Sequence, residues 1–297
     1  MITRVDAHQH FWTLARGDYG WLTSALAPLY RDVEPAELRP LLARHSIDAT
    51  ILVQAAPTEA ETRFLLGIAD DEPFVQGVVG WTDLAAPSAA ATIEALARHS
   101  KLKGLRPMLH DLLQDDWVDV APISAALEAM ASCGLVFDAL VRPANLAALQ
   151  RRVARHPGLN VVVDHAAKPE ISATIARTTA GASPIDADAG FVEWADAMRA
   201  LAAMPNVHCK LSGLLTEAPK HTDAATLRPW VDVLLDCFGP GRLIWGSDWP
   251  VLTLAASYDR WAAITDLLLR DLDDVDRTAI LGANAARVYR LEQDGQR

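Results

Sequence analysis

The sequence is poor in cysteine, in positive charge and in long apolar runs. Its 297 residues include three cysteines, Cys133, Cys209 and Cys237, too few and too far apart for a disulfide framework or a cysteine-ligated zinc site. The formal net charge of -11 argues against nucleic acid or an anionic membrane as a partner. No apolar run reaches the roughly 18 residues that a membrane span needs. With no room for a signal peptide before Val5, we expect a protein of the reducing cytoplasm.

Two widespread enzyme motifs are also missing. No Gly-x-Gly-x-x-Gly turn follows the first strand-like run, which argues against an open, doubly wound sheet that binds a dinucleotide. No Gly-x-Ser-x-Gly segment is present, which argues against a serine esterase.

The chain alternates short apolar runs with amphipathic helical patterns along nearly its whole length. The runs are rich in Val, Ile and Leu, as expected for parallel strands that are buried on both faces. About eight strand–helix units predict an α/β fold, a (β/α)₈ TIM barrel that forms a single domain over residues 1–297. Two stretches, 11–30 and 171–190, look irregular and follow strand ends. We expect them to cover the C-terminal mouth of the barrel.

The first strand carries a pair of histidines, His8 and His10, and the carboxylate of Asp6. Side chains alternate along a strand, so the spacing predicts that all three share one face. Such a pair is able to hold a metal ion or clamp a substrate oxygen, but solvated or core histidines have the same spacing. The pair becomes informative only where other strands bring matching groups to the same place.

Active sites of such barrels form at the C-terminal ends of the strands. The candidates there are His8, His10, Gln54, Trp81, Arg106, His110, Arg142, Asp164, His165, Lys168, Ser212, Ser247, Asp248 and Trp249. Each has a structural alternative: His165 as a core histidine, Asp248 as the cap of a turn, and Arg106 as the partner of a structural carboxylate. The tryptophans are either packing residues or, for Trp81 and Trp249, walls of a pocket for a small ring.

Imidazoles and one carboxylate suit a single divalent metal, most simply zinc, with an open position for water. His8, His10, His165 and Asp248 are the candidate ligands. Asp248 is either a ligand or the base that takes a proton from the attacking water. No lysine or carboxylate ends the fourth strand, so a second metal is not expected.

Four stretches resemble the amidohydrolase superfamily: Asp6–Trp12, Val163–Pro169, Gly246–Pro250 and Gly282–Tyr289. More narrowly, they are similar to its branch of sugar-acid lactonases, which includes enzymes acting on L-fuconolactone and L-rhamnonolactone, and to 2-pyrone-4,6-dicarboxylate lactonase. The resemblance implies a (β/α)₈ barrel. It also implies that His8, His10 and His165 match the imidazole ligands of the family and Asp248 its aspartate on the eighth strand. Arg106 and Lys168 match positions that face substrate.

The resulting hypothesis is a hydrolase that opens a small-molecule sugar-acid lactone, with Asp248 and His165 catalytic. Gln54, Arg106, His110, Lys168, Trp81 and Trp249 are the expected substrate-binding residues. Some lactonases of this branch work without a metal, so the resemblance leaves metal dependence open. Two other activities also stay open: a metal-dependent decarboxylase of an aromatic acid and a 2-pyrone-dicarboxylate-type lactonase. A barrel that only binds a metal or a sugar acid is the non-enzymatic alternative.

Overall fold

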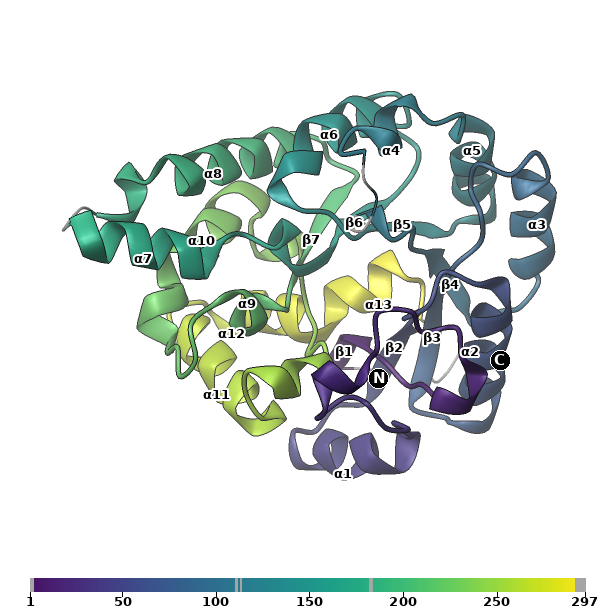
Figure 1. Ribbon diagram of the computed structural model, residues 1–297, viewed down its shortest axis with the longest axis horizontal. Helices are drawn as coiled ribbons and strands as arrows, with labels where there is room; N and C mark the ends of the chain where they lie inside the picture. Colours follow the sequence, from purple (N-terminus) through teal and green to yellow (C-terminus); the bar gives the residue numbers. More distant parts are fainter. Residues whose placement is uncertain (1–2, 110–111, 113, 182–183, 292–297) are drawn as a thin grey trace.

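The computed structural model describes residues 3–109, 112, 114–181 and 184–291, which form a barrel of eight parallel strands (Figure 1). The strands lie side by side in chain order. They are β1 (Val5–Gln9), β2 (Ala49–Val53), β3 (Val75–Gly80), β4 (Leu102–Leu105), β5 (Val136–Ala139), β6 (Val161–Val163), β7 (Val207–Leu211) and β8 (Leu243–Trp245). The predicted (β/α)₈ barrel is confirmed.

The barrel closes between β1 and the segment that follows β8. The amide of His10 donates to the carbonyl of Trp249 at 2.8 Å, and the amide of Asp248 donates to the carbonyl of His8 at 2.8 Å. Closure therefore brings His8, His10 and Asp248 together at the C-terminal end of the barrel.

Helices surround the strands (Figure 1). Local signals set their ends: the side chain of Thr58 accepts a hydrogen bond from the amide of Glu61 at the start of α2, and Gly134, in the left-handed conformation, ends α5. The helices are α1 (Pro35–Arg44), α2 (Glu59–Asp71), α3 (Ala89–Leu96), α4 (Trp117–Val120), α5 (Ser124–Cys133), α6 (Leu146–Ala154), α7 (Ile171–Gly181), α8 (Ala189–Ala202), α9 (Leu214–Glu217), α10 (Ala224–Phe238), α11 (Tyr258–Leu268), α12 (Asp274–Thr278) and α13 (Asn284–Val288). Short 3₁₀ turns are η1 (Leu14–Arg16), η2 (Ser24–Leu26), η4 (Pro143–Asn145), η5 (Asp164–Ala167), η6 (Ile185–Ala187), η7 (Pro240–Arg242) and η8 (Val251–Leu254). Among the described residues, no helix combines the length and the apolar character that crossing a bilayer requires.

Apolar side chains pack inside the barrel, and α13 closes its N-terminal end. Figure 1 shows α13, in yellow, across the ring of strands. The side-chain amide of Asn284 donates to the carbonyl of Leu243, the first residue of β8, at 2.8 Å. The interior cluster contains Val5, Ala7, Ile51, Val53, Val79, Val162, Ile244, Ala285, Val288 and Tyr289. The C-terminal motif of the sequence is therefore a plug beneath the site.

The prediction that 171–190 is irregular is wrong, because residues Ile171–Gly181 form the helix α7. The buried side chains of this helix are Ile171, Thr174 and Thr178, at spacings of three and four residues. The helical period was missed because two of these three positions are threonines rather than apolar residues.

The C-terminal helical segment contains a π-helical stretch, η9 (Ala279–Ala283), between α12 and α13. A Cβ atom on Gly282 would lie 2.2 Å from the carbonyl oxygen of Thr3. Only glycine permits this approach of the helix to the start of β1, and the wider turn accommodates it.

Candidate active site

A cavity of about 170 Å³ opens at the C-terminal end of the barrel. Its lining comprises His10, Trp21, Ala55, Arg106, Met108, Leu140, His165, Lys168, Asp248 and Val251. Five predicted site residues, His10, Arg106, His165, Lys168 and Asp248, are among them. His110 lies outside the described residues.

The first strand does not keep simple alternation, because its pairing with β2 shifts register between Asp6 and Gln9. The carboxylate of Asp6 accepts hydrogen bonds from the amide of Ser247 at 2.8 Å and from the hydroxyl of Tyr258, on α11, at 3.0 Å. The prediction that Asp6 shares a face with both histidines is therefore wrong. Asp6 ties β1 to α11 and to the segment after β8, whereas His8 and His10 turn toward Asp248.

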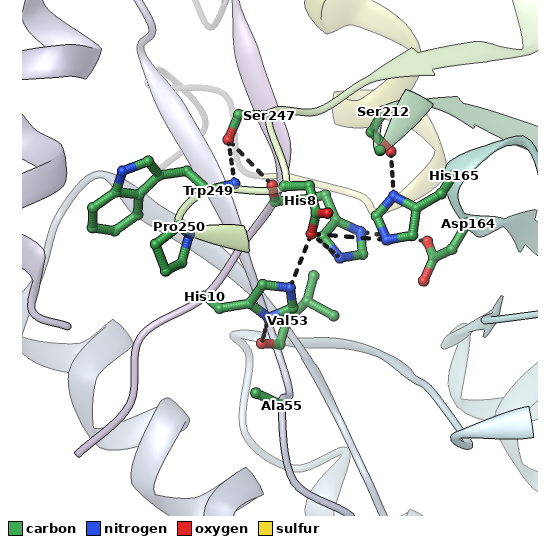
Figure 2. A network of polar contacts seen from close by, with 12 residues as sticks. His8, His10, Val53, Ala55, Asp164, His165, Ser212, Ser247, Trp249 and Pro250 are labelled. Atoms are coloured by element: carbon green, nitrogen blue, oxygen red, sulfur yellow. Dashed lines mark hydrogen bonds and ion pairs between the residues drawn. The ribbon is translucent and has the colours of Figure 1, made fainter. Parts of the chain in front are cut away.

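Three imidazoles converge on one carboxylate oxygen (Figure 2). The Nε2 atoms of three histidines lie near Oδ1 of Asp248, at 3.3 Å for His10, 3.7 Å for His8 and 3.8 Å for His165. All four side chains are nearly inaccessible to solvent.

The opposite ring nitrogens fix two of these imidazoles. Nδ1 of His10 lies 2.7 Å from the carbonyl oxygen of Val53, and Nδ1 of His165 lies 2.9 Å from the hydroxyl of Ser212. A carbonyl oxygen only accepts, so Nδ1 of His10 carries a hydrogen, and in the neutral ring Nε2 presents a lone pair to Asp248.

Burial sets the charges of the cluster. It lowers the pKa of His8 and of His165 well below the usual imidazole value, so both rings are neutral at neutral pH. Burial opposes ionisation of Asp248, but the imidazoles of His165 and His10 hold the pKa of this carboxyl below its usual value. The cluster therefore combines the neutral imidazoles of His8 and His165 with an ionised carboxylate.

This donor set fits a divalent metal. Atoms of His8, His165 and Asp248 able to act as ligands all lie within 4.8 Å of one another. Two ligands of one tetrahedral zinc ion are roughly 3.4 Å apart, close to the distances above. One feature opposes a cation beside His8, because the guanidinium of Arg106 lies 3.3 Å from its Nε2 atom. His8, His165 and Asp248 are nevertheless the candidate ligands, with His10 3.3 Å from the same carboxylate oxygen.

Arg106 is held rigidly in the wall of the cavity. Its guanidinium donates to the carbonyl oxygen of Gln54 and, at 3.2 Å, to the side-chain oxygen of Gln54, and it forms an ion pair with Asp164 at 3.3 Å. The side-chain amide of Gln54 donates in turn to the carbonyl of Arg106 at 2.9 Å. Gln54 is fully buried behind Arg106, so the contact that it makes is with this arginine.

His165 and Lys168 stand on a left-handed turn. Four consecutive residues, 165–168, have φ angles of 51°, 51°, 60° and 49°. This conformation is costly for residues with a Cβ atom and persists where the surroundings enforce it, often at functional sites. Gly213 makes room for the ring, because a Cβ atom there would lie 2.6 Å from Nδ1 of His165. Lys168 reaches the cavity and pairs with Glu217 at 2.9 Å.

The two predicted tryptophans lie in different places. Trp81 lines a second cavity of about 560 Å³, which shares Trp21 and Met108 with the first. Trp249 is 4% exposed and packs edge-to-face on Phe11, with ring centroids 6.1 Å apart. Trp249 thus lies in the packed layer behind the cavity.

Two buried charges next to the site were not predicted, Lys210 on β7 and Asp138 on β5. Both interrupt apolar strand runs. A charge within such a run needs a buried partner, and this signal was sufficient to mark them as candidates.

Comparison with known proteins gives a consistent picture. The sequence model of the family described as Amidohydrolase matches residues 5–291. An L-fucono-1,5-lactonase of Burkholderia ambifaria is 45% identical, over 99% of this chain and 97% of the relative. An L-fucono-1,5-lactonase of Burkholderia multivorans is 39% identical, over 98% of this chain and 97% of the relative. Among solved structures, an amidohydrolase from Burkholderia multivorans with bound zinc superposes with a TM-score of 0.85 at 38% identity, covering 97% of this chain and 99% of that chain.

Proposed function

Because this chain belongs to the amidohydrolase family, we propose that it hydrolyses sugar-acid lactones, with L-fucono-1,5-lactone as the first candidate substrate. The observation that carries the proposal is the convergence of His8, His10 and His165 on Asp248. We expect the protein to act in the cytoplasm, where its free thiols stay reduced.

The cavity fits the substrate class. Its volume of about 170 Å³ suits one sugar ring rather than an extended polymer. Lys168 and Arg106 supply donors for hydroxyl or carbonyl oxygens, and Trp21 supplies an apolar wall. Trp81 offers a further wall to any substituent that reaches the larger cavity.

Asp248 is the general base. It takes a proton from a water molecule as the water oxygen bonds to the lactone carbonyl carbon. Negative charge then develops on the carbonyl oxygen, and the guanidinium of Arg106 lies in the wall of the cavity to stabilise it. The bond from the carbonyl carbon to the ring oxygen breaks, and Asp248 returns its proton to that oxygen. The product is a hydroxy acid, which releases a proton to neutral solution.

A divalent metal, with zinc as the first candidate, would be held by ligands from the set His8, His10, His165 and Asp248. When bound, such an ion polarises a carbonyl and makes water more acidic. His10 and His165 also orient the carboxylate of Asp248, and this role does not depend on a bound metal.

The test is a pH-indicator assay on a panel of 1,5- and 1,4-sugar lactones, with protein as purified and after chelation. We expect acid release from a six-membered lactone, lost in Asp248→Asn. Release that survives chelation assigns the reaction to the protein groups alone, and release restored by zinc assigns a role to the metal. Absence of release from every lactone would overturn the proposal.

A further inference from the structure

Beneath the candidate active site lies a buried cluster of charges that the proposed chemistry does not use. Its centre is Lys210, on β7, which is inaccessible to solvent. The ammonium group donates to Oδ2 of Asp138 at 2.5 Å and to Nδ1 of His8 at 3.2 Å, and it forms an ion pair with Asp164 at 2.9 Å. The cluster thus contacts the site from below without lining the cavity.

The C-terminal plug anchors this cluster. The hydroxyl of Tyr289, directly after α13, lies 2.9 Å from each carboxylate oxygen of Asp138 and donates to this group. The ammonium of Lys210 lies 5.5 Å from the centre of the Tyr289 ring. A continuous set of contacts therefore runs from Tyr289 through Asp138 and Lys210 to His8.

The cluster also reaches the wall of the cavity by a second branch. Asp164, which pairs with Lys210, also forms an ion pair with Arg106 at 3.3 Å. His8 and Arg106 are in contact with each other. Lys210 therefore contacts His8 directly and reaches Arg106, in the wall of the cavity, through Asp164.

A contribution to stability alone is a weak explanation for a buried ammonium group at Lys210. Removing an ammonium ion from water is costly, and apolar residues of similar volume often serve a barrel interior equally well. The charge is nevertheless kept between two carboxylates, which hold the pKa of Lys210 above its ordinary value despite burial.

We propose that Lys210 is a positioning residue for the reaction, which fixes the ring of His8 and the carboxylate of Asp164 from beneath the cavity. The inference rests on the proposed lactonase function. Lys210 does not touch substrate; its effect is exerted through His8 and Arg106.

The first test is Lys210→Met, which keeps the length of the side chain and removes its donors. Displacing catalytic groups by about 1 Å costs on the order of 100-fold in rate, so kcat should fall by about 10- to 100-fold. KM should change by less than about threefold, because Lys210 is not in the cavity wall. Lys210→Met leaves the carboxylate of Asp138 buried without a cation, and the double variant Lys210→Met/Asp138→Asn removes this charge. The double variant should fold better than Lys210→Met and show the same reduced kcat.

The matched control is His208→Gln. His208 lies two residues earlier on β7, is also buried, and interacts electrostatically with Arg242 and Arg287 rather than with the site. This variant should keep kcat and KM within about twofold. Circular dichroism and the melting temperature identify the variants that are folded.

A second measurement does not depend on activity. In nitrogen-15 spectra of the histidines, Lys210→Met should shift the Nδ1 signal of His8, and His208→Gln should leave it in place. A folded double variant with parental kcat and an unshifted His8 signal would overturn the inference. If the parent hydrolyses no lactone, the proposed function fails, and the His8 signal alone decides whether Lys210 positions this ring.

Discussion

His10 and Asp248 face each other at the C-terminal end of the barrel. Nε2 of His10 lies 3.3 Å from Oδ1 of Asp248, while Nδ1 donates its hydrogen to the carbonyl of Val53 at 2.7 Å. An imidazole whose only hydrogen is on Nδ1 presents a lone pair at Nε2, so a cation or the proton of a water molecule fits between this nitrogen and the carboxylate. This is the position at which water is activated in the proposed reaction.

Asp248→Asn is expected to abolish most of the activity. Asparagine has nearly the same size but does not take a proton from water, and general bases contribute about 10²- to 10⁴-fold. We expect kcat to fall by that factor in the pH-indicator assay, with the fold intact by circular dichroism. Asp188→Asn is the control, because Asp188 pairs with Arg177 on α7 and lies outside the cavity lining. Unchanged turnover in Asp248→Asn would exclude this aspartate as the base.

Zinc binding should depend on His10. Val53 holds the Nε2 lone pair of His10 toward Asp248, so His10→Gln removes an oriented ligand. We expect zinc affinity, measured by equilibrium dialysis against a chelator, to fall by at least about tenfold. His208→Gln replaces a buried histidine away from the cluster and should bind zinc as the parent does. Equal affinity in all three proteins would show that the imidazole–carboxylate cluster is not the metal site.

Much of the barrel was predictable, because its strands are short apolar runs with helices between them. The convergence of the first and eighth strands was predictable too, since barrel topology brings His8, His10 and Asp248 to the same end. The helix α7 was not, because Thr174 and Thr178 supply its buried side without an apolar signature.

The orientation of individual side chains was harder to predict. A register shift in β1 separates Asp6 from His8, and it depends on pairing with β2 rather than on local sequence. The position of Trp249 behind the cavity depends on its packing against Phe11. Lys210 and Asp138 form a pair 72 residues apart along the chain, so neither residue reveals its partner locally.

Trp81→Ala should affect large substrates selectively. Trp81 lines the cavity of about 560 Å³ that adjoins the smaller catalytic one. We expect KM to rise by about threefold to tenfold for lactones whose substituent extends beyond the first ring, since aromatic contacts contribute roughly 0.5–1.5 kcal/mol. KM for an unsubstituted lactone should change little. A uniform rise for both classes would instead place Trp81 against the lactone ring itself.

The pH dependence of stability should carry a contribution from His208. This side chain is 4% exposed, and burial lowers its pKa from 6.5 to about 4. The unfolded chain therefore binds a proton at a higher pH than the folded chain does. The resulting stability is fully present above about pH 6.5 and is lost as the pH falls toward 4.

The free energy of unfolding should fall by roughly 3 kcal/mol between these limits, because each unit of pKa shift corresponds to about 1.4 kcal/mol. His208→Gln, which has no proton to bind, should show a smaller decrease in the free energy of unfolding over this range. The measurement is urea unfolding of both proteins at intervals between pH 4 and 7. Parallel pH profiles would mean that His208 accepts a proton equally well in the folded barrel, and that its burial does not control acid stability.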